Sequence, residues 1–308
     1  MKALITGAEG QDGYYLALEL KSLGFEIHGS TISMAALPEG RSQMFTVHEL
    51  DVTDTKAVDA LLIELLPDVL FHLAGISSVA FAQDNRELTF DVNVGGLQNI
   101  LSSIKNHSPH THLVNACSVE IFAPSEVIQN ENSPLGGVNV YAESKQAGFL
   151  VVQDARADGL SASNAILSNH ESPLRPDNFV TGKIAKGVAE ISQGTRQEIV
   201  MGNLDVERDW SAAGDIVHGM VLLAQKRIND DVILASGTTT KLKDLVRLAF
   251  AAVGIENWQD YVVTDPALVR TEGRVRRLDV SKASRVLDWK ASTTPEVWIA
   301  EMVHAHLG

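Results

Sequence analysis

The first 29 residues hold the feature that most restricts how this chain can fold: a short apolar run that leads directly into three evenly spaced glycines. Residues 2–6 are expected to form a β-strand, and residues 12–23 carry the apolar spacing of a helix. Between them, Gly7, Gly10 and Gly13 form the pattern G-x-x-G-x-x-G. Glycines at such a turn let backbone N–H groups and the positive end of the helix approach an anion, which any Cβ would keep away. The motif therefore predicts a site for the pyrophosphate of a dinucleotide.

Strand-like and helix-like segments then alternate along the chain, which indicates an α/β fold. We expect further strands at residues 25–28, 45–50, 69–73, 112–116 and 162–167, and helices at 57–66, 84–106 and 141–158. This alternation predicts a doubly wound parallel sheet of the Rossmann type, with its ligand at the carboxyl ends of the strands.

The composition changes at residue 169, where loops rich in proline, glycine and asparagine begin. Helices are expected there at residues 180–193, 214–227, 242–253, 279–287 and 296–307. We therefore predict a dinucleotide-binding Rossmann domain at 1–168 and a smaller C-terminal α/β lobe at 169–308 that binds the substrate. Exchange of a strand or helix between the two is left open.

The charge balance restricts the class of ligand. A formal net charge of −14 argues against binding nucleic acid or an anionic membrane surface. An anionic small molecule would therefore have to be held by glycine amides and a few local cations. The single cysteine, Cys117, excludes an internal disulfide, fits a reducing compartment and is expected to be a buried strand-end thiol. Since we see neither a membrane-spanning apolar stretch nor a signal peptide, we expect a cytoplasmic protein.

Four polar residues occur where the predicted sheet would hold its ligand. Tyr141 and Lys145 are four residues apart, so both face the same way on one helix, and a nearby ammonium lowers the pKa of a phenol. Ser118 and Glu120 are two residues apart, which would place both on one face of an extended segment. Together they suit hydride transfer at one carbon and proton removal at its neighbour. The alternatives are an exposed helix face for the Tyr–Lys pair, a strand-end hydrogen bond for Ser118 and a solvated loop carboxylate for Glu120.

Longer motifs extend over almost the whole chain. They are I-T-G-A-E-G-Q-D-G at 5–13, N-H-E-S-P at 169–173, N-F-V-T-G-K at 178–183, G-N-L-D-V-E-R-D-W at 202–210 and V-L-D-W-K at 286–290. With these motifs the chain resembles the GDP-mannose 4,6-dehydratase family of the extended short-chain dehydrogenase/reductase superfamily. The middle motifs are far more specific than the glycine turn.

The resemblance implies a catalytic role for each of the four polar residues. It implies Ser118 as the hydroxyl that binds the sugar 4-oxygen, where the family usually has threonine, and Glu120 as the acid/base at C5 and C6. It implies Tyr141 as the proton acceptor at the 4-hydroxyl and Lys145 as the anchor of the nicotinamide ribose.

Binding residues are expected for both the cofactor and the substrate. The expected cofactor-binding residues are Gly7, Gly10, Gln11, Asp12, Gly13, Asp51, Val52, Leu73, Ala74, Gly75, Lys145, His170 and Arg175, of which the last three are implied by the resemblance. The residues that the resemblance implies around the substrate nucleotide and diphosphate are Asn169, Lys183, Arg208 and Arg270. Without the resemblance, the alternative for Lys183 and Arg208 is that they are surface residues, and the alternative for Asp51 is a helix cap.

The choice of cofactor rests on the segment after the second strand. The family usually has paired arginines there that contact a 2′-phosphate, whereas this chain has S-T-I-S at residues 30–33. Neither Asp nor Glu, which would favour NAD, is present at these positions. Arg41 follows in the next loop, although the sequence does not place it. We expect NADP and leave NAD open. No metal site is predicted, because His170-Glu171 lacks a second histidine at the spacing of a zinc motif.

The expected function is that of an NADP-dependent nucleotide-sugar 4,6-dehydratase, a lyase that converts GDP-mannose to GDP-4-keto-6-deoxymannose. Residues 137–140, G-V-N-V, differ from the R-S-P of relatives and leave the hexose open. The rivals are an NAD(P)H-dependent 4-keto-sugar reductase or epimerase of the same superfamily and, from another class, a dinucleotide-sensing pseudoenzyme. The resemblance also implies a homodimer or homotetramer that pairs through the helices at 84–106 and 141–158.

Overall fold

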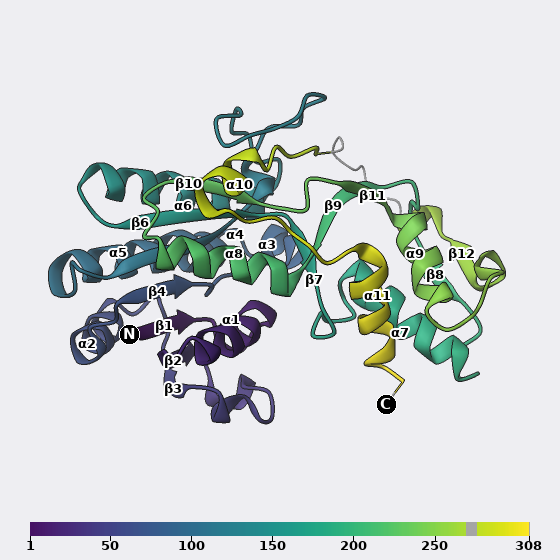
Figure 1. Cartoon of the computed structure of the whole chain (residues 1–308), viewed down its shortest axis with the longest axis horizontal. Helices are drawn as coiled ribbons and strands as arrows, with labels where there is room; N and C mark the ends of the chain where they lie inside the picture. The colour runs from purple at the N-terminus through teal and green to yellow at the C-terminus, as the bar shows by residue number, and fades with distance from the viewer. Residues whose placement is uncertain (269–275, 308) are drawn as a thin grey trace.

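A seven-stranded sheet forms the centre of the computed structural model, which describes residues 1–268 and 276–307 (Figure 1). All neighbouring strands pair in parallel, in the order β10-β6-β5-β4-β1-β2-β3. The strands are β1 (Lys2–Thr6), β2 (Glu26–Thr31), β3 (Thr46–Glu49), β4 (Val69–His72), β5 (His112–Ser118), β6 (Ala162–Leu167) and β10 (Asp231–Leu234). The chain builds outward from β1 to β3 and then returns to β4 on the other side. The predicted doubly wound sheet is confirmed, and its switch point lies between β1 and β4.

Helices cover both faces of this sheet and make three layers. One face is covered by α1 (Gln11–Ser22), α8 (Ala213–Gln225) and α10 (Ser281–Leu287), and the other by α2 (Thr55–Leu65), α5 (Gly96–His107) and α6 (Val140–Ala157). Buried strand residues alternate between the faces, because successive side chains of a strand point to opposite sides.

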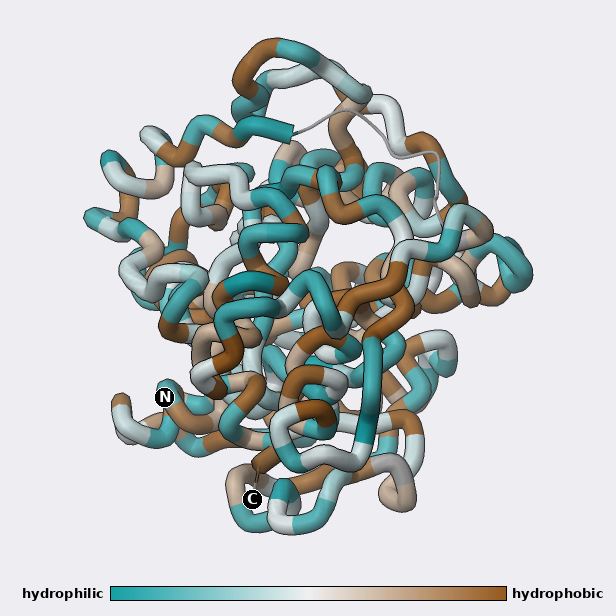
Figure 2. Tube along the Cα trace, turned by 90° about the vertical axis from the view of Figure 1, so that its right-hand side faces the viewer, coloured by the Kyte–Doolittle hydropathy of each residue, from teal (hydrophilic) through white to brown (hydrophobic). Residues whose placement is uncertain are grey.

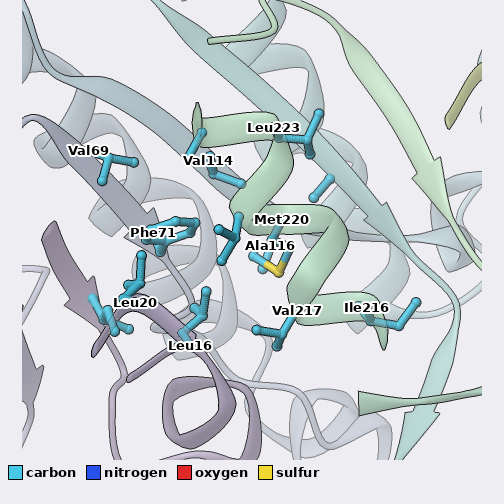
Figure 3. Close-up of a cluster of buried hydrophobic side chains, with 14 of the residues drawn as sticks. Leu16, Leu20, Val69, Phe71, Val114, Ala116, Ile216, Val217, Met220 and Leu223 are labelled. Carbon is cyan, nitrogen blue, oxygen red and sulfur yellow. The ribbon is translucent and has the colours of Figure 1, made fainter. Parts of the chain in front are cut away.

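The face under α1 and α8 carries a large apolar core (Figure 3). Leu16 and Leu20 of α1 meet Phe71 of β4, and Val217 and Met220 of α8 close the cluster from the other side. All five residues are buried. Burying side chains of this size contributes about 1.5–3 kcal/mol each. This packing fixes α1, and with it the glycine turn, against the sheet.

The smaller lobe lies to the right in Figure 1 and consists of two small sheets and three helices. Its elements are β7 (Asn169–Glu171), β8 (Ile199–Met201), β9 (Glu207–Ala212), β11 (Thr239–Lys241), β12 (Val262–Thr264), α7 (Val180–Ser192), α9 (Leu242–Ala251) and α11 (Pro295–His304). One sheet has the order β11-β9-β7, and the other pairs β12 with β8. The chain does not stay in this lobe after residue 169, because β10 pairs with β6 and α8 packs on the large sheet. Elements from the second half of the chain therefore belong to the large sheet, and the division into two domains at residue 168 stays a prediction.

The long helix expected at 84–106 is present as an unbroken helical stretch at 86–107, made of α4 (Arg86–Phe90), a π-helical turn (Asp91–Gly95) and α5. A separate short helix, α3 (Val79–Asp84), precedes it. The break before α4 comes at Asn85, whose φ of −132° and ψ of 54° are not helical. The helix expected at 57–66 begins at Thr55, where the Asp54 carboxylate caps it.

Hydrophobic and hydrophilic residues alternate along most of the helices (Figure 2). This is the pattern of helices with one buried and one solvated face. Short 3₁₀ turns complete the structure, at Met34–Ala36, Arg41–Gln43, Val119–Ile121, Trp258–Tyr261 and Pro266–Leu268. Among the described residues, no helix has the length and apolar character needed to cross a bilayer.

Candidate active site

The three glycines form a tight turn between β1 and α1. Gly7 has a φ of 70°, and a Cβ on it would lie 2.8 Å from the backbone nitrogen of Ala74. A Cβ on Gly13 would lie 2.5 Å from the carbonyl oxygen of Ala8. Gly10 is the N-cap of α1, and no side chain caps the helix there. The turn is therefore a backbone-lined cradle at a helix N-terminus, which fits the pyrophosphate of a dinucleotide.

A cavity of about 600 Å³ opens beside this turn. Its walls come from the segments that follow β1, β4, β5 and β6, from α6 and from the smaller lobe. Of the residues predicted from the sequence, those that line it are Gly7, Gly10, Gln11, Asp12, Gly13, Leu73, Ala74, Gly75, Ser118, Glu120, Tyr141, Lys145, Asn169, His170, Arg175 and Arg208. Residues far apart in the sequence thus meet at the carboxyl edge of the sheet, where this topology places ligands.

Tyr141 and Lys145 lie one turn apart on α6. The Lys145 ammonium donates a hydrogen bond to the carbonyl of Ala116, 2.9 Å away, and burial lowers its pKa. Burial raises the pKa of Tyr141 to about 12, and its hydrogen bond with Ser118 opposes this only in part. The expectation of a lowered tyrosine pKa is therefore wrong. Burial raises the pKa of Tyr141 by more than the other contributions lower it, and the Lys145 ammonium is hydrogen-bonded to a carbonyl of β5.

Glu120 lies in the 3₁₀ turn Val119–Ile121 rather than in an extended segment. The Oγ of Ser118 accepts a hydrogen bond from the N–H of Glu120 at 3.2 Å and so caps this turn. The expectation that the two residues share one face of a strand is therefore wrong, although both line the cavity. The Oε2 of Glu120 is 2.8 Å from Nη1 of Arg276, and the two side chains are 24 % and 11 % exposed, respectively.

His170 links the smaller lobe to the glycine turn. Its Nε2 is 3.0 Å from the carboxylate of Asp12, and its Nδ1 is 2.7 Å from the carbonyl of Ser168. Burial lowers the pKa of His170, but the charge and hydrogen bond of Asp12 outweigh burial and raise it overall. Burial likewise raises the pKa of Asp12, but His170 outweighs this and lowers it overall. The pair is therefore an imidazolium and a carboxylate on the cavity wall.

A second link lies beside this pair, where the Oγ of Ser172 donates a hydrogen bond to Oε1 of Gln11 at 2.7 Å. Gln11 also donates, through Nε2, to the carbonyl of His170 at 3.1 Å. The first turn of α1 and the start of the lobe are thus held together by side chains of the Q-D-G and N-H-E-S motifs.

Two arginines bring positive charge to the lobe side of the cavity. The Nε of Arg175 is 3.2 Å from the Glu171 carboxylate, and its guanidinium lies 3.7 Å from the centroid of the Phe179 ring. Arg208 extends from β9 and lines the cavity wall. In a chain with a net charge of −14, these are the local cations that an anionic ligand needs.

Three predicted residues that the structure describes do not line this cavity, and a fourth is not described. Asp51 accepts hydrogen bonds from Thr53, and Val52 is buried beside α2 and α5. The Lys183 ammonium donates to a backbone carbonyl of β8 at 2.6 Å. Arg270 lies outside the described residues. The binding roles of these four residues stay predictions.

Two residues that were not predicted from the sequence, Asn93 and Arg276, support the site. Asn93 is buried in the π-helical turn, accepts from the N–H of Ile76 at 2.7 Å and donates to Ser144 on α6 at 2.9 Å. It therefore braces the loop after β4 against the helix that carries Tyr141. A polar residue within an apolar helical pattern is its only signal in the sequence, and no motif points to Arg276.

Metal ligation and thiol chemistry find no support in the described part of the chain. Within it, no group of three or more His, Cys, Asp or Glu side chains is arranged to hold a metal ion. Cys117 is buried at the end of β5, as predicted, and burial raises its pKa to about 12. A thiol with that pKa is not a nucleophile near neutral pH.

Known proteins resemble this chain over nearly its whole length. The family model described as GDP-mannose 4,6 dehydratase matches residues 4–302. GDP-mannose 4,6 dehydratase 2 of Arabidopsis thaliana is 33 % identical, with 99 % of this chain and 86 % of that protein covered. GDP-mannose 4,6-dehydratase of Sinorhizobium fredii is also 33 % identical, with 99 % and 96 % covered.

Solved structures share the fold. A putative epimerase from Burkholderia cenocepacia has a TM-score of 0.89 at 23 % identity, with 99 % of this chain and 98 % of the other covered. The structure of RMD from Pseudomonas aeruginosa complexed with NADPH has a TM-score of 0.85 at 23 % identity, with 99 % and 97 % covered. From the family model and the relatives in sequence, the chain belongs to the GDP-mannose 4,6-dehydratase family of the short-chain dehydrogenase/reductase superfamily.

Proposed function

We propose that the protein is an NADP-dependent nucleotide-sugar 4,6-dehydratase that removes water from GDP-mannose. The observation that carries the proposal is the presence of a carboxylate, Glu120, in the same cavity as Ser118, Tyr141 and Lys145, beside the glycine turn. Elimination of water across C5 and C6 of a sugar needs a base next to the carbon that is oxidised. Family membership supports the same reaction.

The cavity wall suits a nicotinamide dinucleotide. The cradle that a Cβ on Gly7 or Gly13 would fill fits its pyrophosphate, and Lys145 would hold the nicotinamide ribose. His170 and Arg175 would complete the cofactor side of the cavity. When bound, the dinucleotide would store the hydride removed from C4 and return it to C6, so that it is regenerated in each turnover.

The protein's own groups would move the protons. Tyr141, hydrogen-bonded with Ser118, would in its deprotonated form accept the proton of the sugar 4-hydroxyl as C4 becomes a ketone; the positive charges of Lys145 and of a bound nicotinamide would favour that form against the effect of burial. The ketone makes the C5 proton acidic, and Glu120 removes it. Glu120 then gives this proton to the hydroxyl leaving C6, which departs as water. A proton taken up at C5 and release of the proton held by Tyr141 complete the cycle.

Cations and amides of the smaller lobe would hold the substrate. Arg208 and Asn169 both line the cavity; Arg208 suits the diphosphate, and Asn169 is proposed for the substrate nucleotide. Lys183 and Arg270 are proposed for the same nucleotide on the strength of the motifs that contain them.

The cofactor is proposed to be NADP because of Arg41. This residue is 7 % exposed, donates to the carbonyl of Gly10 at 3.2 Å and lies 4.3 Å from the centroid of the Tyr14 ring. No ion pair of Arg41 with a carboxylate occurs within the described residues, and a buried cation of this kind suits the 2′-phosphate. One observation favours NAD instead. Glu9 lines the cavity, and its buried Oε2 has no hydrogen-bond partner among the described residues, so it is available to accept a hydrogen bond from a ribose hydroxyl.

The rival function is that of a 4-keto-sugar reductase or epimerase. It would use Ser118, Tyr141 and Lys145 but would need no base at C5, and it is favoured by the ion pair that holds Glu120. A dinucleotide-sensing pseudoenzyme would have no reason to keep the complete set of four groups.

A panel of GDP-hexoses with the wild type and two variants tests the proposal. We expect the wild type to convert GDP-mannose to a product that is lighter by one water. Glu120→Gln should lower kcat by about 10²–10⁴-fold, the usual contribution of an acid/base group. Glu143→Gln is the matched control, because Glu143 is on α6 but pairs with Arg86 on the surface and does not line the cavity. The proposal would be refuted if Glu120→Gln kept full turnover, or if the wild type removed water from none of the sugars in the panel.

A further inference from the structure

Arg276 holds both the side chain and the backbone of the turn that carries Glu120. Its Nη1 is 2.8 Å from Oε2 of Glu120, and its Nη2 donates to the carbonyl of Phe122 at 3.1 Å. Phe122 directly follows the 3₁₀ turn, is fully buried and closes it through a hydrogen bond to Val119. The guanidinium therefore fixes the carboxylate relative to the peptide from which it projects, as the fork of an arginine is suited to do.

The backbone that directly follows Arg276 is also anchored. The N–H of Gln129 donates to the carbonyl of Arg277, and the N–H of Asp279 donates to the carbonyl of Gln129, each at 2.8 Å. Between them, Leu278 is 5 % exposed and packs in the same apolar cluster as Phe122. An arginine held on a rigid segment can hold its partner rigidly in turn.

Other charged and titratable residues lie near Glu120, and the ion pair between Glu120 and Arg276 forms among them. Arg208 and Asp209 line the small pocket that Glu120 and Arg276 share, and Tyr141 lies on the cavity side. Asp209 accepts hydrogen bonds from Ser236 and from the N–H of residue 237, which occupies both of its oxygens. In the described part of the chain, Arg276 makes an ion pair with Glu120 only.

We propose that Arg276 is the positioning residue of the proposed acid/base Glu120, an inference that rests on the proposed function. It ties down Oε2, so that the C5 proton would be taken by Oε1. Because the carboxylate is held in one orientation, Oε1 stays aimed at the sugar while the same proton moves from C5 to the oxygen that leaves C6.

The inference predicts a defect in elimination but not in oxidation at C4, since Arg276 acts through Glu120 alone. Arg276→Gln should lower kcat by about 10- to 100-fold, less than loss of the carboxylate itself, with KM for the sugar nucleotide changed less than threefold. In a single turnover, absorbance of the reduced dinucleotide should build up in this variant, as it should in Glu120→Gln. Arg276→Lys keeps the charge and should have a smaller defect, with kcat about three- to tenfold below that of the wild type.

Arg277→Gln is the matched control, because Arg277 is the exposed neighbour of Arg276 and should leave kcat, KM and absorbance unchanged. Melting temperatures of all variants report whether they fold. If Arg276→Gln fails to fold, Arg276→Lys decides: a kcat about three- to tenfold below wild type with unchanged KM supports the inference.

The outcomes separate this inference from the proposed function. If the wild type releases water and Arg276→Gln turns over at the normal rate, the positioning role alone is overturned. The same holds for normal turnover in Arg276→Lys where that variant decides. A rise in KM with unchanged kcat also overturns it and makes Arg276 a substrate-binding residue. A wild type that releases no water from any sugar overturns the proposed function and this inference with it.

Discussion

Replacing Gly13 by alanine gives the sharpest test of the cradle at the start of α1. An alanine Cβ would lie 2.5, 2.6 and 2.7 Å from the carbonyl oxygen, Cα and carbonyl carbon of Ala8. All three are backbone atoms of the glycine turn itself, so no side chain can rotate away to relieve the contact. The first turn of α1 must therefore move relative to β1.

The magnitude follows from a comparison with a second glycine. Gly95, in the π-helical turn, has open space where a Cβ would lie, with no atom within 4 Å of that position. Both substitutions gain about 1 kcal/mol of helix propensity, and only Gly13→Ala adds the clash. Overpacking of this kind costs about 1–3 kcal/mol, so the free energy of unfolding of Gly13→Ala should be lower than that of Gly95→Ala by this amount.

Chemical unfolding of the two variants measures this difference, and titration with NADP measures the consequence for the site. We expect Gly13→Ala to bind the dinucleotide about tenfold more weakly or worse, since 1.4 kcal/mol corresponds to a factor of ten. Gly95→Ala should bind as the wild type does. Equal stability and equal affinity in the two variants would refute the assignment of the glycine turn as the pyrophosphate cradle.

Three further outcomes follow from the structure. Burial lowers the pKa of His112 to about 4, so the folded protein keeps this side chain neutral while the unfolded chain binds a proton as the pH falls below 6.5, and the folded state loses stability. His112→Gln should remove about 2 kcal/mol of the stability lost between pH 7 and pH 5, measured by urea unfolding. An unchanged loss of stability in this variant would contradict the prediction. Arg41→Ala should weaken NADP binding at least tenfold with little effect on NAD, whereas a wild type that prefers NAD would point to Glu9 instead. Leu88 on α4 and Leu150 on α6 are 48 % and 41 % exposed, as expected if these helices pair between subunits. Leu88→Asp should therefore convert a dimer or tetramer to monomers, measured by light scattering, and a monomeric wild type would refute the predicted pairing through these helices.

The parts of the fold that rest on local patterns could be predicted from the sequence. The strand at Lys2–Thr6, the glycine turn and the alternation up to β6 each follow from apolar periodicity and from the positions of glycine. The spacing of Tyr141 and Lys145 put both on one face of α6 because a helix repeats every 3.6 residues. In each case the decisive interaction lies within a few residues along the chain.

The parts that depend on distant contacts could not be predicted in this way. Glu120 meets Arg276 across 156 positions of sequence, and an ion pair of that kind leaves no periodic trace. The spacing of Ser118 and Glu120 also fails to place the carboxylate, because residues two apart share a face only while the backbone stays extended, and the chain turns at Ser118. The return of β10 to the large sheet depends on its register with β6, which local propensity does not specify.

The fate of the hydrogen at C4 tests the proposed reaction most directly. GDP-mannose carrying deuterium at C4 should yield a 4-keto-6-deoxy product that has lost one water and retains the deuterium at C6, with no net consumption of added dinucleotide. A product that still contains the C6 hydroxyl, or that takes its C6 hydrogen from solvent or from added reduced dinucleotide, would contradict the dehydratase mechanism.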